Sequence, residues 1–283
     1  MDKRRVEEGL FKGLMILSTV LILSVLGLML GTVVLKGLPA MNIAMITQAP
    51  KGGYYLGKEG GILNAIIGSL YLAGGASFLS ILISVPVVLY LNVFGEKQTR
   101  LISFTRFSLD VLWGVPSIVY GAFGFTILIT LGLRASLLGG IITVGLLIMP
   151  IMSRGMDEVV RMVPRELLEA SYALGATKLE TALKVVVRQA LPGILTAVLI
   201  AFGRGIGDAA SVIFTTGFSD YVPRSLFRPA ATLPLAIFFQ LGTPFPEVQD
   251  RAYASAFVLT VIILLISIIC RVLTHRFTRH VMR

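Results

Sequence analysis

The sequence has few charged residues, one cysteine and two histidines, and each scarcity excludes a class of protein or site. Charged residues make up 14% of the 283 positions, whereas soluble domains carry about 25%. Cys270 stands alone, which excludes an internal disulfide and a thiolate metal cage. His275 and His280 both lie in the carboxy-terminal tail and leave nothing for a zinc site. We therefore expect no metal and no cofactor.

Apolar residues, by contrast, are abundant. They make up 55% of the chain, and the mean hydropathy is +0.87. One soluble core of this length could not bury so much apolar surface, so most of the chain must lie in lipid. This composition excludes most soluble enzyme folds.

Six apolar stretches are long enough to cross a bilayer of about 30 Å, which takes about 20 helical residues. They cover residues 11–35, 62–94, 107–131, 137–152, 193–218 and 252–270. We expect an all-α membrane protein with six transmembrane helices. The first stretch follows three basic residues, as a signal peptide would, but its length favours an anchor that stays in the protein.

Lysine and arginine are distributed unevenly between the two sides of these spans. With the amino terminus in the cytoplasm, the cytoplasmic segments hold most of the 25 basic residues, and Arg204 alone lies within a span. The positive-inside rule favours this orientation, with both termini cytoplasmic. The net charge of +10 is then a consequence of topology, and we expect no nucleic-acid partner.

The longest cytoplasmic loop, residues 153–191, contains the start and stop signals of two helices. Pro164 suits a first helical position, and Gly175 can supply the left-handed residue that ends a helix. Thr177 and Glu180 have the spacing of a capping box for a second helix. The pattern predicts two short helices joined at a glycine corner. Physical reasoning alone leaves open whether this pair lies on the membrane surface or docks a partner.

Residues 169–171 of this loop read Glu-Ala-Ser, and Gly175 follows after three more residues. This spacing resembles the EAA motif of ABC importer permeases, in which the helix-glycine-helix sits in a groove of the cytoplasmic ATPase. Ser171 replaces the third small residue, Val187 stands where leucine is usual, and Arg188 stands where proline is usual. The resemblance implies a type I ABC importer permease fold with a cytoplasmic coupling helix. The residues that it assigns to ATPase coupling are Glu169, Ala170, Ser171, Gly175, Thr177 and Glu180.

Three further segments are similar to the phosphate permeases of this group. They are residues 60–72 at the start of the second span, residues 110–121 in the third, and residues 203–210 in the fifth. Together with the loop they point to the PstA type of phosphate ABC permease, although the sister PstC type shares part of the pattern. The implied organisation is an amino-terminal segment of residues 1–60, with the first span and an outer loop, followed by a permease core of residues 61–283.

The resemblance also implies partners and a location. The partners would be a dissimilar second permease of the PstC type, a cytoplasmic ATPase dimer of the PstB type, an extracytoplasmic phosphate-binding protein of the PstS type, phosphate itself and the lipid bilayer. The location would be the plasma (inner) membrane of a prokaryote. The chain would be a transport subunit and not an enzyme, with ATP hydrolysis in a separate partner.

Arg204 is costly inside a membrane and needs a partner or a polar cavity. Asp208 follows four residues later, which predicts an ion pair on one helix face. One interpretation is a structural salt bridge that locks the fifth span to its neighbours. The other is that Arg204 lines an anion pathway and that Asp208 tunes the position of its guanidinium. Gly203 and Gly207 could permit close helix packing or leave room for a hydrated anion. We favour a substrate pathway formed by Arg204, Asp208, Gly203 and Gly207.

Other polar and kinked positions have simpler interpretations. Asp110 lies near Arg106, and we expect an interfacial salt bridge between them. Pro86 and Pro116 predict kinks within spans. Residues 231–239 are apolar but too short to span, which predicts a re-entrant segment or a surface helix.

One motif is a decoy, and three functions are alternatives to a phosphate importer. Residues 52–58 have part of the Walker A spacing, but Glu59 occupies the position of the magnesium-binding hydroxyl. A stand-alone secondary anion carrier would not need a structured coupling loop, and the spans lack the several carboxylates of a proton relay. A membrane phosphoryl-transfer enzyme would need a nucleophile and an acid cluster, which the two tail histidines cannot supply. A permease for another oxyanion is separated from a phosphate permease only by the resemblance.

Overall fold

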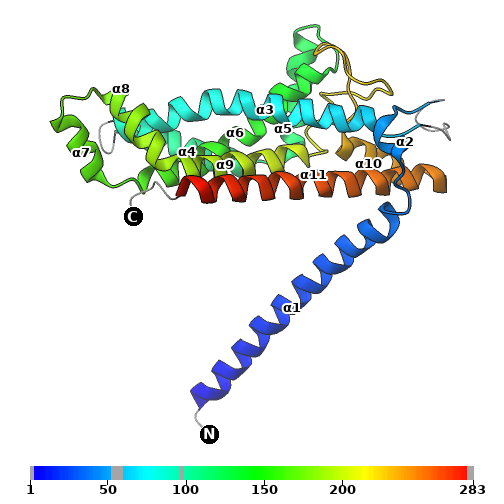
Figure 1. The fold of residues 1–283 in the computed structure, drawn as a ribbon, viewed down its shortest axis with the longest axis horizontal. Coiled ribbons are helices and arrows are strands. Elements are labelled where there is room, and N and C mark those ends of the chain that lie inside the picture. Colours follow the sequence, from blue (N-terminus) through cyan, green and yellow to red (C-terminus); the bar gives the residue numbers. More distant parts are fainter. Residues whose placement is uncertain (1–2, 52–59, 96–98, 279–283) are drawn as a thin grey trace.

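The computed structural model describes residues 3–51, 60–95 and 99–278. Within these ranges the regular elements are all helices, as the sequence predicts (Figure 1). The decoy motif at residues 52–58 and Glu59 fall outside the described residues. The elements are α1 Lys3–Gly37, α2 Ile43–Thr47, α3 Leu63–Leu89, the π-helix η1 Tyr90–Phe94, α4 Arg100–Gly114, α5 Ser117–Thr130, α6 Leu137–Arg161, α7 Arg165–Ala173, α8 Lys178–Glu180, the π-helix η2 Thr181–Val186, α9 Val187–Ile206, α10 Leu233–Leu241 and α11 Pro246–Thr278.

Five helical stretches of the described chain are long and apolar enough to cross a membrane, and a bent pair raises the number to six. The five stretches are Glu7–Gly37, Leu63–Phe94, Leu137–Arg161, Lys178–Ile206 and Pro246–Val272. The predicted number of spans is therefore reached only if the bent pair counts as one.

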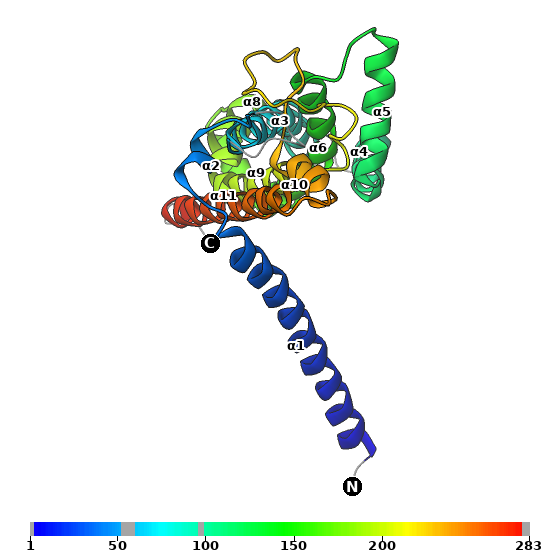
Figure 2. The same cartoon turned by 90° about the vertical axis from the view of Figure 1, so that its right-hand side faces the viewer.

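The expected third span, residues 107–131, is wrong as a continuous helix. It consists of α4 and α5, whose axes are bent by 101°, and α5 stands at the side of the bundle (Figure 2). The break is at Val115, which has an extended backbone with ψ 129°. Pro116 follows directly, and a proline disfavours the helical conformation of the residue before it. The predicted kink at Pro116 is thus a break between two helices.

The fourth span is longer than predicted, because α6 continues past Pro150 to Arg161. Proline removes a backbone donor and leaves carbonyls of the preceding turn without their helical partner. Hydroxyl groups of α3 bond to carbonyls in this part of α6. Ser80 Oγ donates to Gly145 O at 2.8 Å. The carbonyl that loses its donor to Pro150 is that of Leu146, so the bond to Gly145 O holds α6 against α3 beside the proline.

The core of the bundle lies between α3 and α6, which have the most extensive mutual contact, and α9 packs against both. Ala76, Val144, Ile148 and Met152 are completely buried there. Ser153 Oγ donates to Ser84 Oγ at 2.9 Å within this interface. Interhelical hydroxyl bonds satisfy polar groups that lipid could not.

The long helix α1 lies apart from the bundle (Figures 1 and 2). No residue in its most apolar window is buried. It meets the rest of the chain near its carboxyl end, where Lys36 Nζ donates to the hydroxyl of Tyr253 in α11 at 3.3 Å. Most of its apolar surface is therefore left for lipid or another subunit.

The fifth span differs most from the prediction of residues 193–218. It runs as one stretch from Lys178 through η2 and α9, and it ends at Ile206. The following residues, 207–232, are not helical, yet Ser211, Thr215 and Thr216 are fully buried. Their backbone bonds to other elements, since Ser136 N donates to Thr215 O at 2.9 Å. Apolar composition predicted a span here, but backbone pairing with the start of α6 replaced the helix.

The predicted short segment at residues 231–239 forms the helix α10. Thr232 caps it, and Leu233 and Leu235 are fully buried against neighbouring elements. Leu233 N donates to Ser69 Oγ of α3 at 2.7 Å. The segment is therefore a short helix that packs one face on α11 and α3, while Phe238 on its other face is 58% exposed.

Candidate coupling and pathway sites

The helix-glycine-helix of the central loop has the predicted geometry. Helix α7 ends in a turn in which Gly175 N donates to Tyr172 O at 2.9 Å and Ala176 N donates to Ser171 O at 3.1 Å. Gly175 has φ +84°, which lies in the left-handed region that residues with a side chain rarely adopt. Pro164 precedes α7 as its N-cap, with ψ 133°, so its assignment to the first helical position is wrong by one residue.

The second helix of the corner begins with the predicted capping box. Thr177 Oγ1 accepts from Glu180 N at 3.2 Å, and Glu180 Oε2 accepts from Thr177 N at 3.1 Å. This helix is not a separate hairpin arm, because it continues through η2 into α9. The corner is thus joined directly to a membrane span, which the sequence pattern did not predict.

Ser171, the residue that departs from the usual motif, bonds across the corner. Its hydroxyl lies 2.9 Å from Thr181 Oγ1 in η2, and Thr181 is fully buried. A small apolar residue at position 171 could not make this bond. The departure is therefore matched by a local partner in this chain.

The outer surface of the corner is exposed and partly apolar. No residue of α7 is buried, and Glu169 and Ala170 are exposed. Leu174 is 90% exposed, and Leu179 and Leu183 are more than half exposed. The corner forms one end of the bundle (Figure 1). An apolar tip on a structured projection favours contact with another surface over exposure to water.

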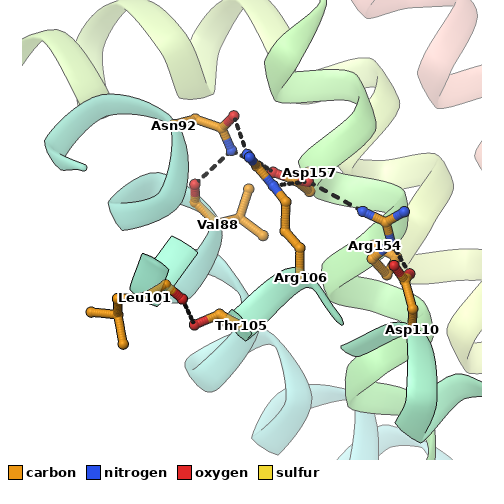
Figure 3. Close-up of polar contacts among 8 residues, drawn as sticks. All are labelled: Val88, Asn92, Leu101, Thr105, Arg106, Asp110, Arg154 and Asp157. Carbon is orange, nitrogen blue, oxygen red and sulfur yellow. Dashed lines mark hydrogen bonds and ion pairs between the residues drawn. The ribbon is translucent and has the colours of Figure 1, made fainter. Parts of the chain in front are cut away.

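A polar network lies at the base of α6, just before α7 (Figure 3). Asp157 has no exposed side-chain surface, and Arg106 bonds to it twice, through Nε at 2.9 Å and Nη2 at 3.0 Å. Asn92 Nδ2 donates to Asp157 Oδ1 at 2.7 Å. Arg154 Nη1 lies 3.5 Å from Asp157 Oδ2. A buried carboxylate needs such donors to offset its loss of hydration.

The predicted salt bridge between Asp110 and Arg106 is wrong. Asp110 pairs with Arg154 of α6 at 2.6 Å, and Arg106 is turned toward Asp157 (Figure 3). Both guanidiniums lie between α4 and α6, and each pairs with a carboxylate on the opposite helix. Sequence proximity favoured the pair four residues apart within one helix.

Sequence reasoning missed Asp157 and Asn92. Asn92 lies in η1, where its Nδ2 also donates to Val88 O at 2.9 Å, satisfying a carbonyl at the widened turn. A π-turn of this kind is rare and often marks a functional position. The usable signal for Asp157 was its spacing of three residues from Arg154, at the end of an apolar span.

The predicted pair of Arg204 and Asp208 does not form. Helix α9 ends at Ile206 with Gly207 as its C-cap, so Asp208 lies beyond the helix and not one turn along it. Its Oδ2 accepts from Ser211 N at 2.8 Å, and the side chain is buried, whereas Arg204 is exposed. Within the described chain no ion pair joins the two.

The two glycines beside Arg204 do not serve packing within this chain. A Cβ atom added at Gly203 would meet nothing within 4 Å, and one added at Gly207 would meet only the carbonyl of Gly203 at 3.5 Å. The space at these two glycines is therefore open within the described chain.

Glu180 of the corner and Arg204, a candidate pathway residue, lie toward opposite ends of one helical stretch. Residues 178 and 204 are 26 positions apart along the stretch from Lys178 to Ile206, which corresponds to about 40 Å. In the outer segment beyond α9, Asp220 Oδ1 is buried without a hydrogen-bond partner among the described residues. Burial raises the pKa of the Asp220 carboxyl above its ordinary value.

Comparison with known proteins adds sequence relatives and a common fold. The family described as "Binding-protein-dependent transport system inner membrane component" matches residues 95–283. The phosphate transport system permease protein PstA of Haemophilus influenzae is 32% identical over 268 residues, which cover 95% of this chain and 94% of that protein. PstA of Yersinia pestis is 35% identical over 240 residues, covering 85% and 80%.

Among solved structures, the inward-facing MetNI methionine ABC transporter aligns with 76% of this chain and 95% of its own, with a TM-score of 0.63 and 19% identity. This similarity concerns the fold alone. The chain therefore belongs to the inner-membrane components of binding-protein-dependent transport systems, and among them to the PstA family of phosphate transport system permeases.

Proposed function

We propose that this chain is the transmembrane permease subunit of an ATP-driven importer that moves inorganic phosphate into the cytoplasm by alternating access. The observation that carries the proposal is the similarity to PstA over 95% of the chain, and the glycine corner at Gly175 supports it. The chain itself would bind and move the ion, and ATP hydrolysis would take place in a separate subunit.

The coupling surface would be the exposed corner formed by α7, Gly175 and α8. Its apolar tip, with Leu174 and Leu179, would enter a groove of the cytoplasmic ATPase, and the capping box would keep the corner rigid. Because α8 continues into α9, a displacement of the corner would move the whole helix as a body. The residues assigned to this role are Glu169, Ala170, Ser171, Gly175, Thr177 and Glu180.

The substrate pathway would pass the far end of α9. Arg204 is exposed near the end of α9, the neighbouring Gly203 and Gly207 leave open space, and a guanidinium can bond two oxygens of one phosphate. Asp208 would act as a positioning residue, since its bond to Ser211 N shapes the turn after α9. A carboxylate held in this bond would not compete with the anion for Arg204.

The proposed assembly contains three other kinds of protein. A second permease of the PstC type would complete the pathway with the core of residues 61–283. A dimeric ATPase of the PstB type would bind the corner, and a phosphate-binding protein of the PstS type would deliver the ion from outside. In this arrangement the chain spans the plasma membrane of a prokaryote with both termini in the cytoplasm.

The test is transport by the extracted complex. The tagged chain is purified in mild detergent from its native membrane, its bound partners are identified, and the complex is reconstituted in vesicles with ATP on the coupling side. We expect an ATPase and a dissimilar permease to copurify, and radiolabelled phosphate to be taken up in preference to sulfate. Glu169→Lys should abolish uptake but not insertion.

Recovery of the chain alone with ATP-independent uptake would indicate a secondary carrier. Preferential uptake of sulfate or a phosphonate would indicate an importer for another oxyanion.

A further inference from the structure

A cavity of about 570 Å³ lies beside the coupling corner, away from the proposed phosphate pathway. It is bounded by η1, the start of α4, the end of α6 and helix α7. Its polar lining includes Asn92, Arg106, Arg161, Arg165, Glu169 and Tyr172. Three arginines and one carboxylate give this lining an excess of positive charge.

Two of these arginines are available to a ligand. Arg161 ends α6 and Arg165 begins α7, on either side of a three-residue turn, and both are exposed. Neither forms an ion pair within the described ranges, with Glu169 or with any other carboxylate. Arginines that face a common cavity without a carboxylate partner are typical of sites that bind phosphate groups.

The inner part of the cavity adds polar groups that are already held in place. Arg106 is held in place by two hydrogen bonds to Asp157, and its Nη2 also donates to Asn92 Oδ1 at 3.3 Å (Figure 3). Its side chain keeps 25% of its surface exposed. Helix α7 starts at the same place without a side-chain cap. Leu167 N already donates to Pro164 O at 3.3 Å, so the N–H groups of Arg165 and Glu166 are the ones left for an anion.

We propose that this cavity is a binding site for a phosphate group, held between Arg161 and Arg165 above the Arg106–Asn92 pair. The group would come either from free inorganic phosphate or from the headgroup of an anionic phospholipid. A ligand here would link the end of α6 to α7 and so influence the position of the coupling corner. That the cavity faces the cytoplasm rests on the proposed function, but binding itself does not.

The experiment measures binding by the full-length chain in lipid nanodiscs. Every protein carries Arg204→Gln, so that the proposed pathway contributes little. Inorganic phosphate is titrated calorimetrically into discs of zwitterionic phosphatidylcholine. We expect saturable binding that Arg161→Gln weakens at least tenfold, as the loss of a charge-assisted bond implies. Arg271→Gln is the matched control, since Arg271 is exposed on α11 and does not line the cavity.

A second series uses discs that contain phosphatidylglycerol, with retained lipid counted by native mass spectrometry. Phosphatidylglycerol held by the chain but lost from Arg161→Gln would identify a headgroup as the source. Saturable binding of inorganic phosphate in the first series would identify the free ion. The proposal is overturned if neither ligand binds, or if Arg161→Gln and Arg271→Gln change binding equally. Because transport is not measured, this result stands apart from the uptake test.

Discussion

At the residue scale, the charged side chains do not form the ion pairs that their spacing suggested. Arg204 and Asp208 are four positions apart, but the end of α9 at Ile206 separates them. Asp110 and Arg106 also have helical spacing, but both bond to residues of α6. A local pair at the surface of one helix contributes only about 0.5 kcal/mol, so tertiary packing readily overrides it.

Arg204→Gln is expected to lower phosphate uptake about tenfold or more while the complex still assembles. Glutamine cannot supply the charge or the paired donors of a guanidinium, and bonds to charged groups contribute about 1.5–3 kcal/mol. Initial uptake rates in vesicles, with assembly checked by copurification, measure the effect. Arg204→Lys keeps the charge, so its uptake rate should lie between those of the unchanged protein and the Arg204→Gln variant. Unchanged uptake in Arg204→Gln would make Arg204 structural.

Asp220→Asn is expected to stabilise the chain at neutral pH and to have no effect in acid. Burial raises the pKa of this carboxyl, so its ionisation costs folding free energy progressively as the pH rises above the ordinary value, and the whole cost is reached above the raised value. Below the ordinary value of 3.8, the carboxyl is neutral in both states and resembles asparagine. Thermal unfolding in detergent at several pH values tests this. A stabilisation that does not depend on pH would contradict it.

At the element scale, the joints between helices depart most from regular helical geometry, and the proposed coupling role falls on one of them. The corner at Gly175 joins α7 to a span, the Asp157 network ties α6 to α4 and η1, and the break at Pro116 turns α5 away from α4. The corner was predictable because its signals are local. The network was not, because its members come from three elements distant in the sequence.

Gly175→Ala is expected to uncouple ATP hydrolysis from transport, because a left-handed conformation costs an L-residue about 1–2 kcal/mol. A Cβ atom would meet nothing within 4 Å there, so the effect would come from the backbone alone. Gly175→Asn should be milder, since asparagine tolerates this conformation. Gly74→Ala in α3 is the control, as its added Cβ also meets open space and its φ is not positive. ATPase rates with and without phosphate measure coupling. Equal coupling in the Gly175→Ala and Gly74→Ala proteins would refute this role.

Asp157→Asn is expected to destabilise the chain by about 3 kcal/mol, the lower end of the range for breaking a buried ion pair. The substitution would leave Arg106 without its counter-charge at a site where Asp157 is fully buried. Asp110→Asn is the control and should cost less than about 1 kcal/mol, because that side chain is 49% exposed. Thermal exposure of the buried Cys270 to a thiol-reactive dye reports unfolding. Equal destabilisation by Asp157→Asn and Asp110→Asn would show that the buried network around Asp157 adds no stability beyond that of an exposed ion pair.

At the scale of the whole molecule, the chain is incomplete as an isolated unit. Helix α1 and the bent pair of α4 and α5 expose long apolar surfaces, and the coupling corner projects from one end of the bundle (Figures 1 and 2). Such surfaces need lipid or other subunits. This agrees with a permease that works as one part of a larger complex.

The proposed orientation predicts opposite labelling of two exposed positions. In a Cys270→Ala background, Leu174→Cys at the coupling corner should react with a membrane-impermeant maleimide only in inside-out vesicles. Tyr221→Cys in the outer loop should react only in right-side-out vesicles. Both parent residues are more than 80% exposed. The reverse pattern would place the corner outside the cell and refute the coupling role.

The sequence by itself determined the membrane environment, the all-helical class and the capped glycine corner. Each depends on local composition or on interactions between residues close in the chain, such as Thr177 with Glu180. The family resemblance was likewise carried by short motifs. It also implied which residues take part in coupling and transport.

Only the tertiary structure decided where the helices break and which charges meet. The apolar segment after Ile206 gave up helical bonds for backbone pairing with α6, and Arg106 and Arg154 found carboxylates through the contact of α4 with α6. These outcomes depend on distances between elements. In a bilayer every buried polar group needs a partner within the protein, but the bilayer does not determine which residue that partner is. The partner of each buried polar group is therefore a property of the packed bundle.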